Sequence, residues 1–368
     1  MHYKDIICNI IQREVGGRMK KVTNFVVLLI MIMIPLMACN NQSNKANVIQ
    51  EEVFALGTII EFKIYDDDSK KAKEAIDKSI QRIREIEDKM TINKDKSELI
   101  EINNNAGINF IYVSPDTFFV IKKASEYSKL SQGAFDLTIE PIVKLWGIGT
   151  DNARIPKQEE IDVLLDLINY EDLILDEESQ SVMLRKKGQA IDLGAIAKGY
   201  AGDEVKRILT EHGIQTAFVN LGGNVVAIGT KVDGSPWKIG IQNPLDERGS
   251  HVAVIEVKDK AVVTSGNYER YFIKDGKRYH HIIDPKTGYP AEAGIISSTI
   301  VTDQSIDADA LSTAVYVMGL EKGLKLIERM ENVEAVIITE DNQIYVTAGL
   351  REDFKLSNPQ FQLLENLN

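Results

Sequence analysis

Cysteine is almost absent from this chain, which has Cys8 and Cys39 and no other among its 368 residues. The chain after Cys39 therefore has no disulfide and no thiol chemistry, which excludes a cysteine nucleophile or a cysteine-bound iron–sulfur cluster there. Positive charge is also in deficit, with 43 lysines and arginines against 55 acidic residues and a net charge of −12. This deficit argues against nucleic acid as a partner and against adsorption to anionic lipid through a basic patch.

Long apolar runs are scarce as well, and the one such run lies near the N-terminus. Met19–Lys21 is a short basic start, Val22–Ala38 follows without a charged residue, and Leu36–Cys39 closes the run. These are the parts of a secretory signal, and the last four residues resemble the lipobox of bacterial lipoproteins. The resemblance implies lipidation of Cys39 and cleavage before it. The alternative is a single transmembrane anchor, although the run is slightly short of the roughly 20 residues that a span needs.

The sequence therefore divides into four parts. We expect residues 1–18 to come from an over-long gene model, 19–38 to be the signal peptide, 39–50 to be the lipidated cysteine with a polar tether, and 51–368 to be the functional domain. This predicts a protein anchored by lipid to the cell membrane, on its extracytoplasmic face. A domain of roughly 300 residues is ample for a core.

Hydrophobic periodicity predicts helices and strands in mixed order through this domain. The expected helices are Ser69–Met90, Pro115–Gln132, Pro156–Leu167, Gly199–His212, Asp307–Met318 and Leu320–Met330. The expected strand regions are Glu51–Tyr65, Leu173–Arg185, Ala217–Phe272 and Val333–Val346. Because strands and helices do not alternate strictly, the pattern favours an α+β fold over a doubly wound sheet.

Six short segments interrupt the amphipathic rhythm with glycine, aspartate and histidine: 133–138, 191–200, 220–224, 264–268, 280–288 and 307–314. The plain interpretation of 133–138 is a tight turn followed by a packed strand. In 191–200, small residues let the backbone approach a ligand, and the helix that follows offers free N–H groups to an anion. The alternative there is a strand-to-helix junction with Lys198 in solvent. The glycine pair in 220–224 is also compatible with a hairpin turn.

Two of these segments hold residues with clear chemical preferences. His280 and His281 are adjacent, and zinc binding by both is disfavoured because neighbouring side chains of a strand point to opposite faces. Asp309 and Thr313 share one face of a predicted helix at a spacing of four. A carboxylate with a hydroxyl suits a hard cation such as Mg²⁺ better than Zn²⁺. The alternative is an N-cap aspartate and a threonine bonded back into its own helix.

Taken together and in this order, the segments resemble one family, the FAD:protein FMN transferases (the ApbE family). The resemblance runs from Phe54–Thr58 to about Gly349. It implies a single globular unit with mixed, largely antiparallel sheets and packed helices, similar to a T-fold. It also implies an enzyme that binds FAD and, with Mg²⁺, transfers the FMN half to a threonine or serine hydroxyl of a target flavoprotein, releasing AMP. The expected acceptors are flavoproteins of an extracytoplasmic or membrane electron-transfer chain.

The resemblance further assigns roles to individual positions. The residues that it places against FAD are Leu56, Asn93, Ala134, Phe135, Asp136, Asp192, Lys198 and Ile283. It gives Mg²⁺ the main-chain oxygen of Ala195 and the side chains of Asp309 and Thr313. It matches His281 to a histidine thought to be catalytic. The incoming hydroxyl needs a base, which His281 could supply, and Asp284 is a competitor for that role or an orienter of the histidine.

Two positions depart from the family pattern. Leu56 stands where many members have methionine, which is a mild apolar change. Asn93 stands where many have a tyrosine, and an asparagine cannot stack on an aromatic ring.

Two other functions use much of the same site: a Mg²⁺-dependent FAD pyrophosphatase, in which water replaces the target hydroxyl, and a flavin-binding lipoprotein without chemistry. The presence of His281, Asp309 and Thr313 speaks against the second.

Overall fold

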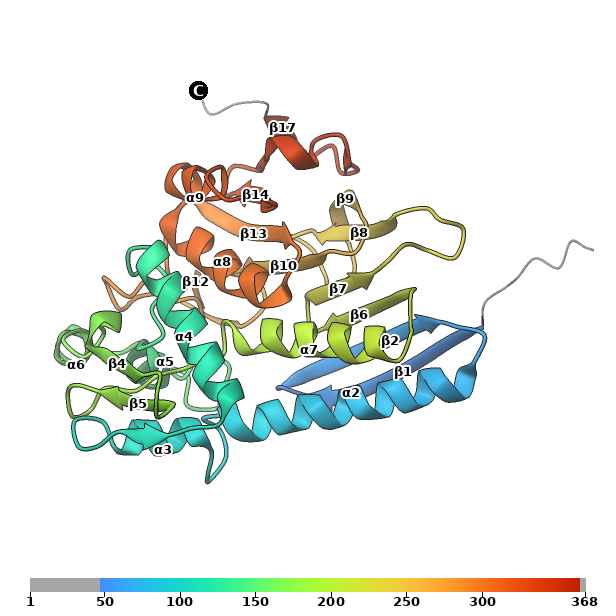
Figure 1. Ribbon diagram of the computed structural model, residues 1–368. Helices are drawn as coiled ribbons and strands as arrows, with labels where there is room; N and C mark the ends of the chain where they lie inside the picture. The colour runs from blue at the N-terminus through green and yellow to red at the C-terminus, as the bar shows by residue number, and fades with distance from the viewer. Residues whose placement is uncertain (1–46, 365–368) are drawn as a thin grey trace, which may run out of the picture. The chain divides into compact units, whose positions relative to one another are not determined.

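The computed structural model describes residues 47–364. Its largest element is a nine-stranded sheet of order β1-β2-β6-β7-β10-β13-β14-β15-β17, antiparallel except where β15 pairs with β17 (Figure 1). The strands are β1 Val48–Ala55, β2 Thr58–Tyr65, β6 Ala217–Leu221, β7 Asn224–Ile228, β10 Ala261–Gly266, β13 Ile295–Thr302, β14 Glu334–Thr339, β15 Gln343–Val346 and β17 Gln362–Leu364. Cys39 and the rest of the predicted signal and lipidation site lie outside the described residues.

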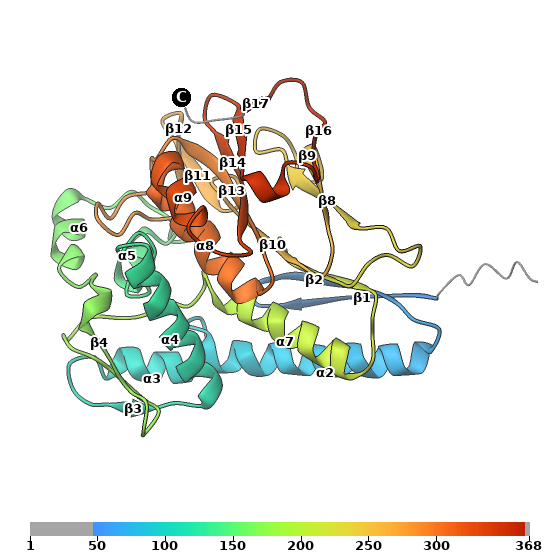
Figure 2. The same ribbon diagram turned by 45° about the horizontal axis from the view of Figure 1, so that its top comes forward.

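Helices lie on one face of this sheet and to one side of it. They are α2 Ser69–Met90, α3 Glu98–Asn104, α4 Pro115–Leu130, α5 Glu140–Trp146, α6 Gln158–Leu165, α7 Ala197–Glu211, α8 Ser305–Met318 and α9 Leu320–Ile327. Helices α2, α7, α8 and α9 cover the sheet face, and the other helices lie to one side of it. Figure 2 shows α2 and α7 side by side, with α2 packed on β1 and α7 on β6 and β7, and α8 and α9 continuing the layer. None of the helices in residues 47–364 is both long and apolar enough to span a bilayer.

Three small sheets complete the fold. They are β16 Phe354–Leu356 with β9 His251–Val257 and β8 Trp237–Gln242; β3 Ile111–Tyr112 with β5 Ser181–Leu184 and β4 Leu173–Asp176; and the hairpin of β11 Tyr271–Lys274 and β12 Lys277–His280. The first of these packs on the sheet face opposite the helices, because Ile239 and Ile255 share a core with Val262 and Val336. The architecture is therefore α+β and largely antiparallel, as the sequence predicts.

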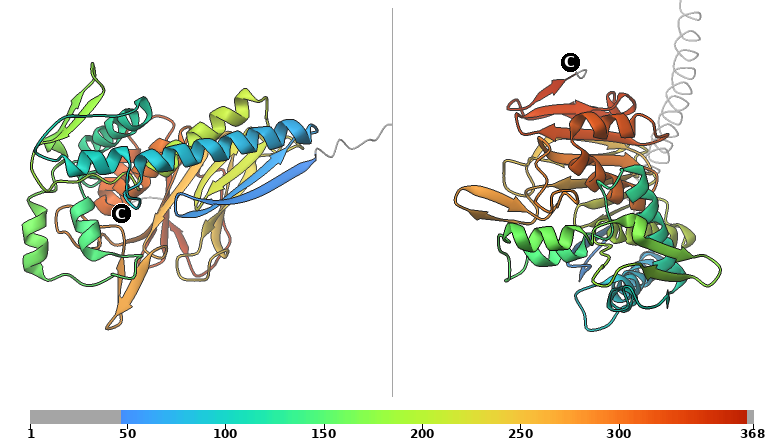
Figure 3. Two further views of the ribbon diagram at one scale, coloured as in Figure 1. Left: turned by 90° about the horizontal axis from the view of Figure 1, so that it is seen from below. Right: turned by 90° about the vertical axis from the view of Figure 1, so that its left-hand side faces the viewer.

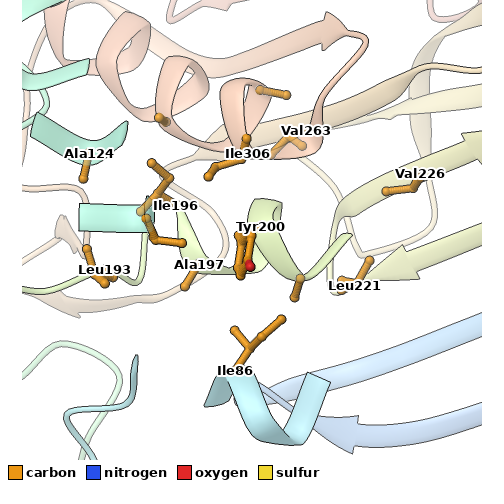
Figure 4. Packing of buried hydrophobic residues seen from close by; sticks show 14 of the residues in the cluster. Ile86, Ala124, Leu193, Ile196, Ala197, Tyr200, Leu221, Val226, Val263 and Ile306 are labelled. Carbon is orange, nitrogen blue, oxygen red and sulfur yellow. The ribbon is translucent and has the colours of Figure 1, made fainter. Parts of the chain in front are cut away.

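The main core lies between the large sheet and the helices. Every second residue of β2 is buried beneath α2, as expected for a strand with one face toward the core. These residues are Ile60, Phe62 and Ile64. The predicted bounds of α2 are confirmed, and the Asp68 carboxylate caps it by accepting from the backbone N–H of Lys70. Figure 4 shows Tyr200 and Ile306 inside this core, where α7 meets α8.

Three local predictions differ from the structure. The strand expected after residue 138 is wrong: those residues form α5, and a proline in its first turn suits a helix start. The short helix α3 is absent from the predicted elements. β1 begins at Val48, so residues 48–50, expected in the tether, belong to the sheet.

Candidate functional site

A close approach between α7 and α8 organises the site. A Cβ on Gly199 would lie 2.3 Å from the carbonyl oxygen of Ser305 and 2.8 Å from the Cβ of Asp309. Only glycine therefore lets the first turn of α7 touch the first turns of α8. The N–H of Gly199 uses this contact to donate to Oδ2 of Asp309 at 2.9 Å.

The start of α8 is fixed by a second residue of α7. Asp203 accepts from the backbone N–H groups of Ser305 at 2.6 Å and Ile306 at 2.9 Å, which are orphan donors at a helix N-terminus. Burial raises the pKa of Asp203 to about 6, against the lowering effect of those two hydrogen bonds. The aspartate thus sets the position of α8, and with it that of Asp309 one turn later. Sequence reasoning missed Asp203, because no spacing distinguishes it from a solvent-facing helix residue.

The three residues predicted to bind metal present oxygen atoms where α7 and α8 meet. Asp309 is 4% exposed, and the Thr313 hydroxyl lies 3.2 Å from that of Ser265 on β10. α7 begins at Ala197, so the Ala195 carbonyl lies before the helix. A carboxylate, a hydroxyl and a carbonyl form a donor set that suits Mg²⁺.

No group of three or more histidine, cysteine or acidic side chains in residues 47–364 is placed to hold a metal ion. A site with one carboxylate would therefore draw further oxygen ligands from elsewhere, as Mg²⁺ commonly does from substrate phosphates and water.

Lys198 points into the same region rather than into solvent. Its ammonium donates to Oδ1 of Asn224 at 2.8 Å and lies 3.8 Å from Oδ1 of Asp309. Asn224 comes from the predicted segment 220–224, at the start of β7. Its Nδ2 is buried and has no hydrogen-bond partner within the described part of the chain. A buried donor without a partner is costly, so it indicates that a polar ligand group belongs beside Lys198.

His281 has its backbone paired to Arg270 and lies within the electrostatic influence of Lys198. Its N–H donates to the Arg270 carbonyl at 3.1 Å, and its Nδ1 lies 3.3 Å from the same oxygen. Burial, followed by the positive charge of Arg270, lowers the pKa of His281 to about 4, and the charge of Lys198 acts in the same direction. A ring whose Nδ1 proton is held by a carbonyl keeps Nε2 as a free acceptor. The imidazole is therefore neutral at physiological pH and able to take a proton.

The side chains of His280 and Asp284, which lie near His281 in sequence, make hydrogen bonds to the backbone around them. His280 is buried against Tyr316 and its Nε2 lies 3.1 Å from the Ala291 carbonyl, so the two histidines face apart as predicted. Asp284 Oδ1 accepts from the N–H of Lys286 and closes the turn that follows. Between residues 47 and 364, no hydrogen bond links Asp284 to His281, so the geometry favours the histidine as base.

The predicted flavin positions 134–136 lie between α4 and α5 in the chain. Asp136 is buried, accepts from the N–H and hydroxyl of Thr138 and from the N–H of Tyr170, and has its pKa raised by burial. Ala134 and Phe135 precede it and are buried. Ile283 packs into the small core that contains Trp146. The side chains of Asp136 and Ile283 are therefore already used in contacts of their own.

Asp192 and the β1–β2 turn meet at Arg270. Burial raises the pKa of Asp192, against the hydrogen bond from the Gly194 N–H and the charge of Arg270. The Arg270 guanidinium reaches the tip of the turn, 3.9 Å from where a Cβ on Gly57 would stand. Leu56 has φ of 52°, and its N–H donates to Glu87 of α2. Arg270 is a site residue that sequence reasoning missed, because a single arginine just before a short strand carries no signal of its own.

Asn93 lies apart from this network in the structure. It is exposed on the loop after α2, and its N–H donates to the Thr91 hydroxyl. No hydrogen bond within residues 47–364 joins it to the other predicted site residues.

This arrangement has counterparts among known proteins. The sequence profile of the ApbE family matches residues 56–337. The chain belongs to the ApbE family. It is 35% identical to an FAD:protein FMN transferase of Klebsiella pneumoniae (strain 342), over 84% of this chain and 95% of that protein. It is 31% identical to an FAD:protein FMN transferase of Treponema pallidum (strain Nichols), over 91% of this chain and 96% of that protein.

Solved structures of the ApbE family share the fold. The ApbE protein of Thermotoga maritima superposes with a TM-score of 0.77 at 34% identity, covering 83% of this chain and 99% of that one. The flavin transferase ApbE of Vibrio cholerae superposes with a TM-score of 0.76 at 29% identity, covering 84% and 99%. The predicted family and α+β fold are confirmed.

Proposed function

We propose that this chain is a Mg²⁺-dependent FAD:protein FMN transferase that moves FMN from FAD to a threonine or serine hydroxyl of a target flavoprotein. The relatives that share most of its length carry that name. The observation that carries the proposal is the meeting of an oxygen donor set at Asp309, the ammonium of Lys198 and a neutral His281. Transfer of a charged phosphoryl group to a hydroxyl needs a metal, a cation and a base in one place.

The reaction is a displacement at the phosphorus atom of the FMN half of FAD. The acceptor oxygen forms a bond to that phosphorus while the bond from phosphorus to the bridging pyrophosphate oxygen breaks. AMP leaves with the bridging oxygen and its electron pair. The acceptor hydroxyl gives its proton to Nε2 of His281, which passes it to solvent. The acceptor keeps FMN through a phosphoester.

Ala195, Asp309 and Thr313 would hold Mg²⁺, which supplies positive charge to the pyrophosphate and to the leaving oxygen. Lys198 adds a second positive charge from the first turn of α7, and Asn224 Oδ1 holds its ammonium in position. The N-terminus of α7, whose first N–H groups lack helical acceptors, also favours an anion.

The flavin and its linker would be enclosed by Leu56, Ala134, Phe135, Asp136, Asp192 and Ile283. Because Asp136 and Ile283 are fixed by their own contacts, their contribution is to shape and rigidify the wall. Asn93 would lie at the rim of the pocket, where a stacking aromatic ring is missing.

The fate of the flavin distinguishes a transferase from an FAD pyrophosphatase. The purified chain is incubated with FAD, Mg²⁺ and a candidate acceptor flavoprotein, and the acceptor is run on a denaturing gel. Fluorescent flavin on the acceptor, in step with AMP release, is the expected result. AMP and free FMN with an unlabelled acceptor would make the protein a pyrophosphatase.

We further propose that the enzyme works at the outer face of the cell membrane through lipid on Cys39. A polar stretch and then β1 follow that cysteine, and confinement to one surface raises the rate at which enzyme and membrane-bound acceptor meet. Growth with a labelled fatty acid should label the wild-type protein and leave Cys39→Ser unlabelled. Equal labelling of both would exclude this anchor.

A further inference from the structure

The segment 264–268 reaches the candidate site through one side chain of β10. Successive residues of a strand point to opposite faces of the sheet, so Thr264 and Ser265 face apart. Thr264 Oγ1 lies 2.8 Å from Oγ1 of Thr299 on the neighbouring strand β13. Ser265 faces the helix α8, which lies against β10 and β13 (Figure 3). Ser265 is therefore placed beneath the helix that carries Thr313, one of the side chains proposed to bind the metal.

Three hydroxyl groups and one carbonyl group form a chain of hydrogen bonds at this point. Ser265 Oγ lies 2.8 Å from Oγ of Ser312 and 3.2 Å from Oγ1 of Thr313. Ser312, which is buried, donates in turn to the main-chain carbonyl of Asp309 at 2.9 Å. The bond back into its own helix that the sequence allows for Thr313 is thus made by Ser312, and the Thr313 hydroxyl turns to the strand instead.

The direction of this chain of hydrogen bonds follows from counting its protons. Each hydroxyl group has one proton to donate, and a carbonyl oxygen can only accept. The proton of Ser312 is used on the carbonyl, so Ser312 accepts from Ser265. The one proton of Ser265 is then used as well, so its oxygen accepts from Thr313. This is the only assignment that supplies a proton to all three hydrogen bonds.

The consequence for Thr313 is that its proton is directed to the strand. A hydroxyl that donates its proton in one direction keeps both lone pairs for other partners. A cation binds a hydroxyl oxygen through a lone pair, and groups that hold a metal ligand in the required orientation strengthen metal binding. The same chain ends on the carbonyl of Asp309, so it also ties together the two turns of α8 that carry the proposed side-chain ligands.

We propose that Ser265 is a positioning residue of the metal site, which accepts the proton of Thr313 and so presents the threonine oxygen to the cation. The inference rests on the proposed Mg²⁺ site and adds to it a residue that does not touch the cation. It also gives the segment 264–268 a role in the enzyme. Because Ser265 acts through Thr313, loss of its hydroxyl weakens metal binding only while the threonine hydroxyl is present.

The test measures metal binding directly and does not depend on turnover. Mn²⁺, which shares the oxygen ligands of Mg²⁺, is titrated into the full chain with FAD and without an acceptor. Unbound Mn²⁺ is counted by electron paramagnetic resonance, with FAD alone as the blank. Ser265→Val and Ser265→Thr are compared, because valine and threonine have the same shape and differ in the hydroxyl group.

A matched control is available on the neighbouring strand. Ser298 is paired with Ser265 across β10 and β13, so its side chain lies on the same face of the sheet. It is fully buried, and its Oγ has no hydrogen-bond partner within residues 47–364. Ser298→Ala therefore removes a nearby hydroxyl group that is outside the chain of hydrogen bonds.

Ser265→Val should raise the dissociation constant of Mn²⁺ about tenfold, as is common when a partner of a metal ligand is lost. Ser265→Thr should stay close to wild type, and Ser298→Ala should match it. In a Thr313→Val background, Ser265→Val should cause no further loss, whereas a general packing defect would add to the first one.

Equal dissociation constants for Ser265→Val and Ser265→Thr would overturn the positioning role, as would a further loss in the Thr313→Val background. A wild-type chain that binds no Mn²⁺ would instead contradict the proposed metal site itself, so the two failures are distinguishable.

Discussion

The backbone N–H of Gly199 donates to Oδ2 of Asp309 at 2.9 Å, and this contact joins the first turn of α7 to α8. It does two things for the site. It holds the carboxylate beside Lys198, and it gives an acceptor to one of the N–H groups that the first turn of α7 leaves without a helical partner. A single helix-to-helix contact thus fixes the carboxylate proposed for the metal.

Replacement of Asp309 by asparagine should lower FMN transfer by a factor of 100 or more, because it removes the one carboxylate of the metal site while keeping the acceptor for the Gly199 N–H. The measurement is the transfer rate as a function of Mg²⁺ concentration. Asp307→Asn is the control, since Asp307 lies on the same helix but pairs with Lys123. Equal Mg²⁺ dependence in wild type and Asp309→Asn would show that the metal binds elsewhere.

Gly199→Ala should destabilise the fold by roughly 1–3 kcal/mol, the usual range for an overpacked contact, because its Cβ would meet backbone atoms of Ser305 and Ile306. Urea unfolding measures the loss. Gly240→Ala is a suitable control, because its Cβ would meet the His251 side chain at 3.3 Å and needs a much smaller shift. If the two variants unfold at the same urea concentration, α7 and α8 are not in close contact.

As pH is lowered, the transfer rate should fall with a midpoint near pH 4 rather than near pH 6.5. The pKa of His281 is lowered to about 4, so its base form is present above that value and is lost as pH falls through it. Arg270→Gln removes one lowering influence and should move the midpoint upward. The check is the pH dependence of kcat for both proteins. A midpoint at pH 6.5 in both would mean that His281 is exposed or is not the base.

An ion-pair network away from the chemistry should control stability. Arg82 of α2 binds Asp116 of α4 through two hydrogen bonds and also contacts Glu204 of α7. Arg82→Ala should cost about 2–4 kcal/mol, since it removes the guanidinium shared by two partly buried carboxylates and leaves Asp116 with only Lys89 and Tyr200. Arg154→Ala, which breaks the exposed pair with Glu160, should cost less than about 1 kcal/mol. Thermal unfolding of the two variants makes the comparison, and equal shifts would contradict it.

The same network gives a pH dependence of stability with a definite sign. The Arg82 guanidinium holds the pKa of Asp116 well below its usual range. A carboxyl whose pKa is depressed by folding contributes stability above its unfolded value of about 3.9, and that stability is lost as pH falls further. Asp116→Asn should therefore be less stable than wild type at pH 7, and the difference should shrink below pH 4.

The sequence predicts those parts of this protein in which a local pattern decides the structure. The spacing of Ala72, Ile76 and Ile83 sets the buried face of α2, and Asp68 sets its start. The strand predicted after residue 138 fails because Pro141 begins a helix whose apolar residues are too few to show a period. Asp309 is predicted by its spacing from Thr313, together with the family resemblance.

Other site residues depend on contacts that are distant in sequence. Arg270 lies in the site because the β1–β2 turn and Asp192 approach it, and both are distant from it in sequence. Asp203 caps a helix that begins about 100 residues later. The position of Lys198 also depends on distant contacts, because Asn224 and Asp309 lie beside its ammonium group.

The most direct test of the account is the intact mass of an acceptor flavoprotein after incubation with the enzyme, FAD and Mg²⁺. The account predicts that the acceptor gains the mass of one FMN group, that the gain survives acid denaturation, and that Asp309→Asn enzyme reduces it sharply. A peptide map should then place the group on a threonine or serine hydroxyl. An acceptor of unchanged mass in the presence of released AMP and free FMN would contradict the transferase assignment.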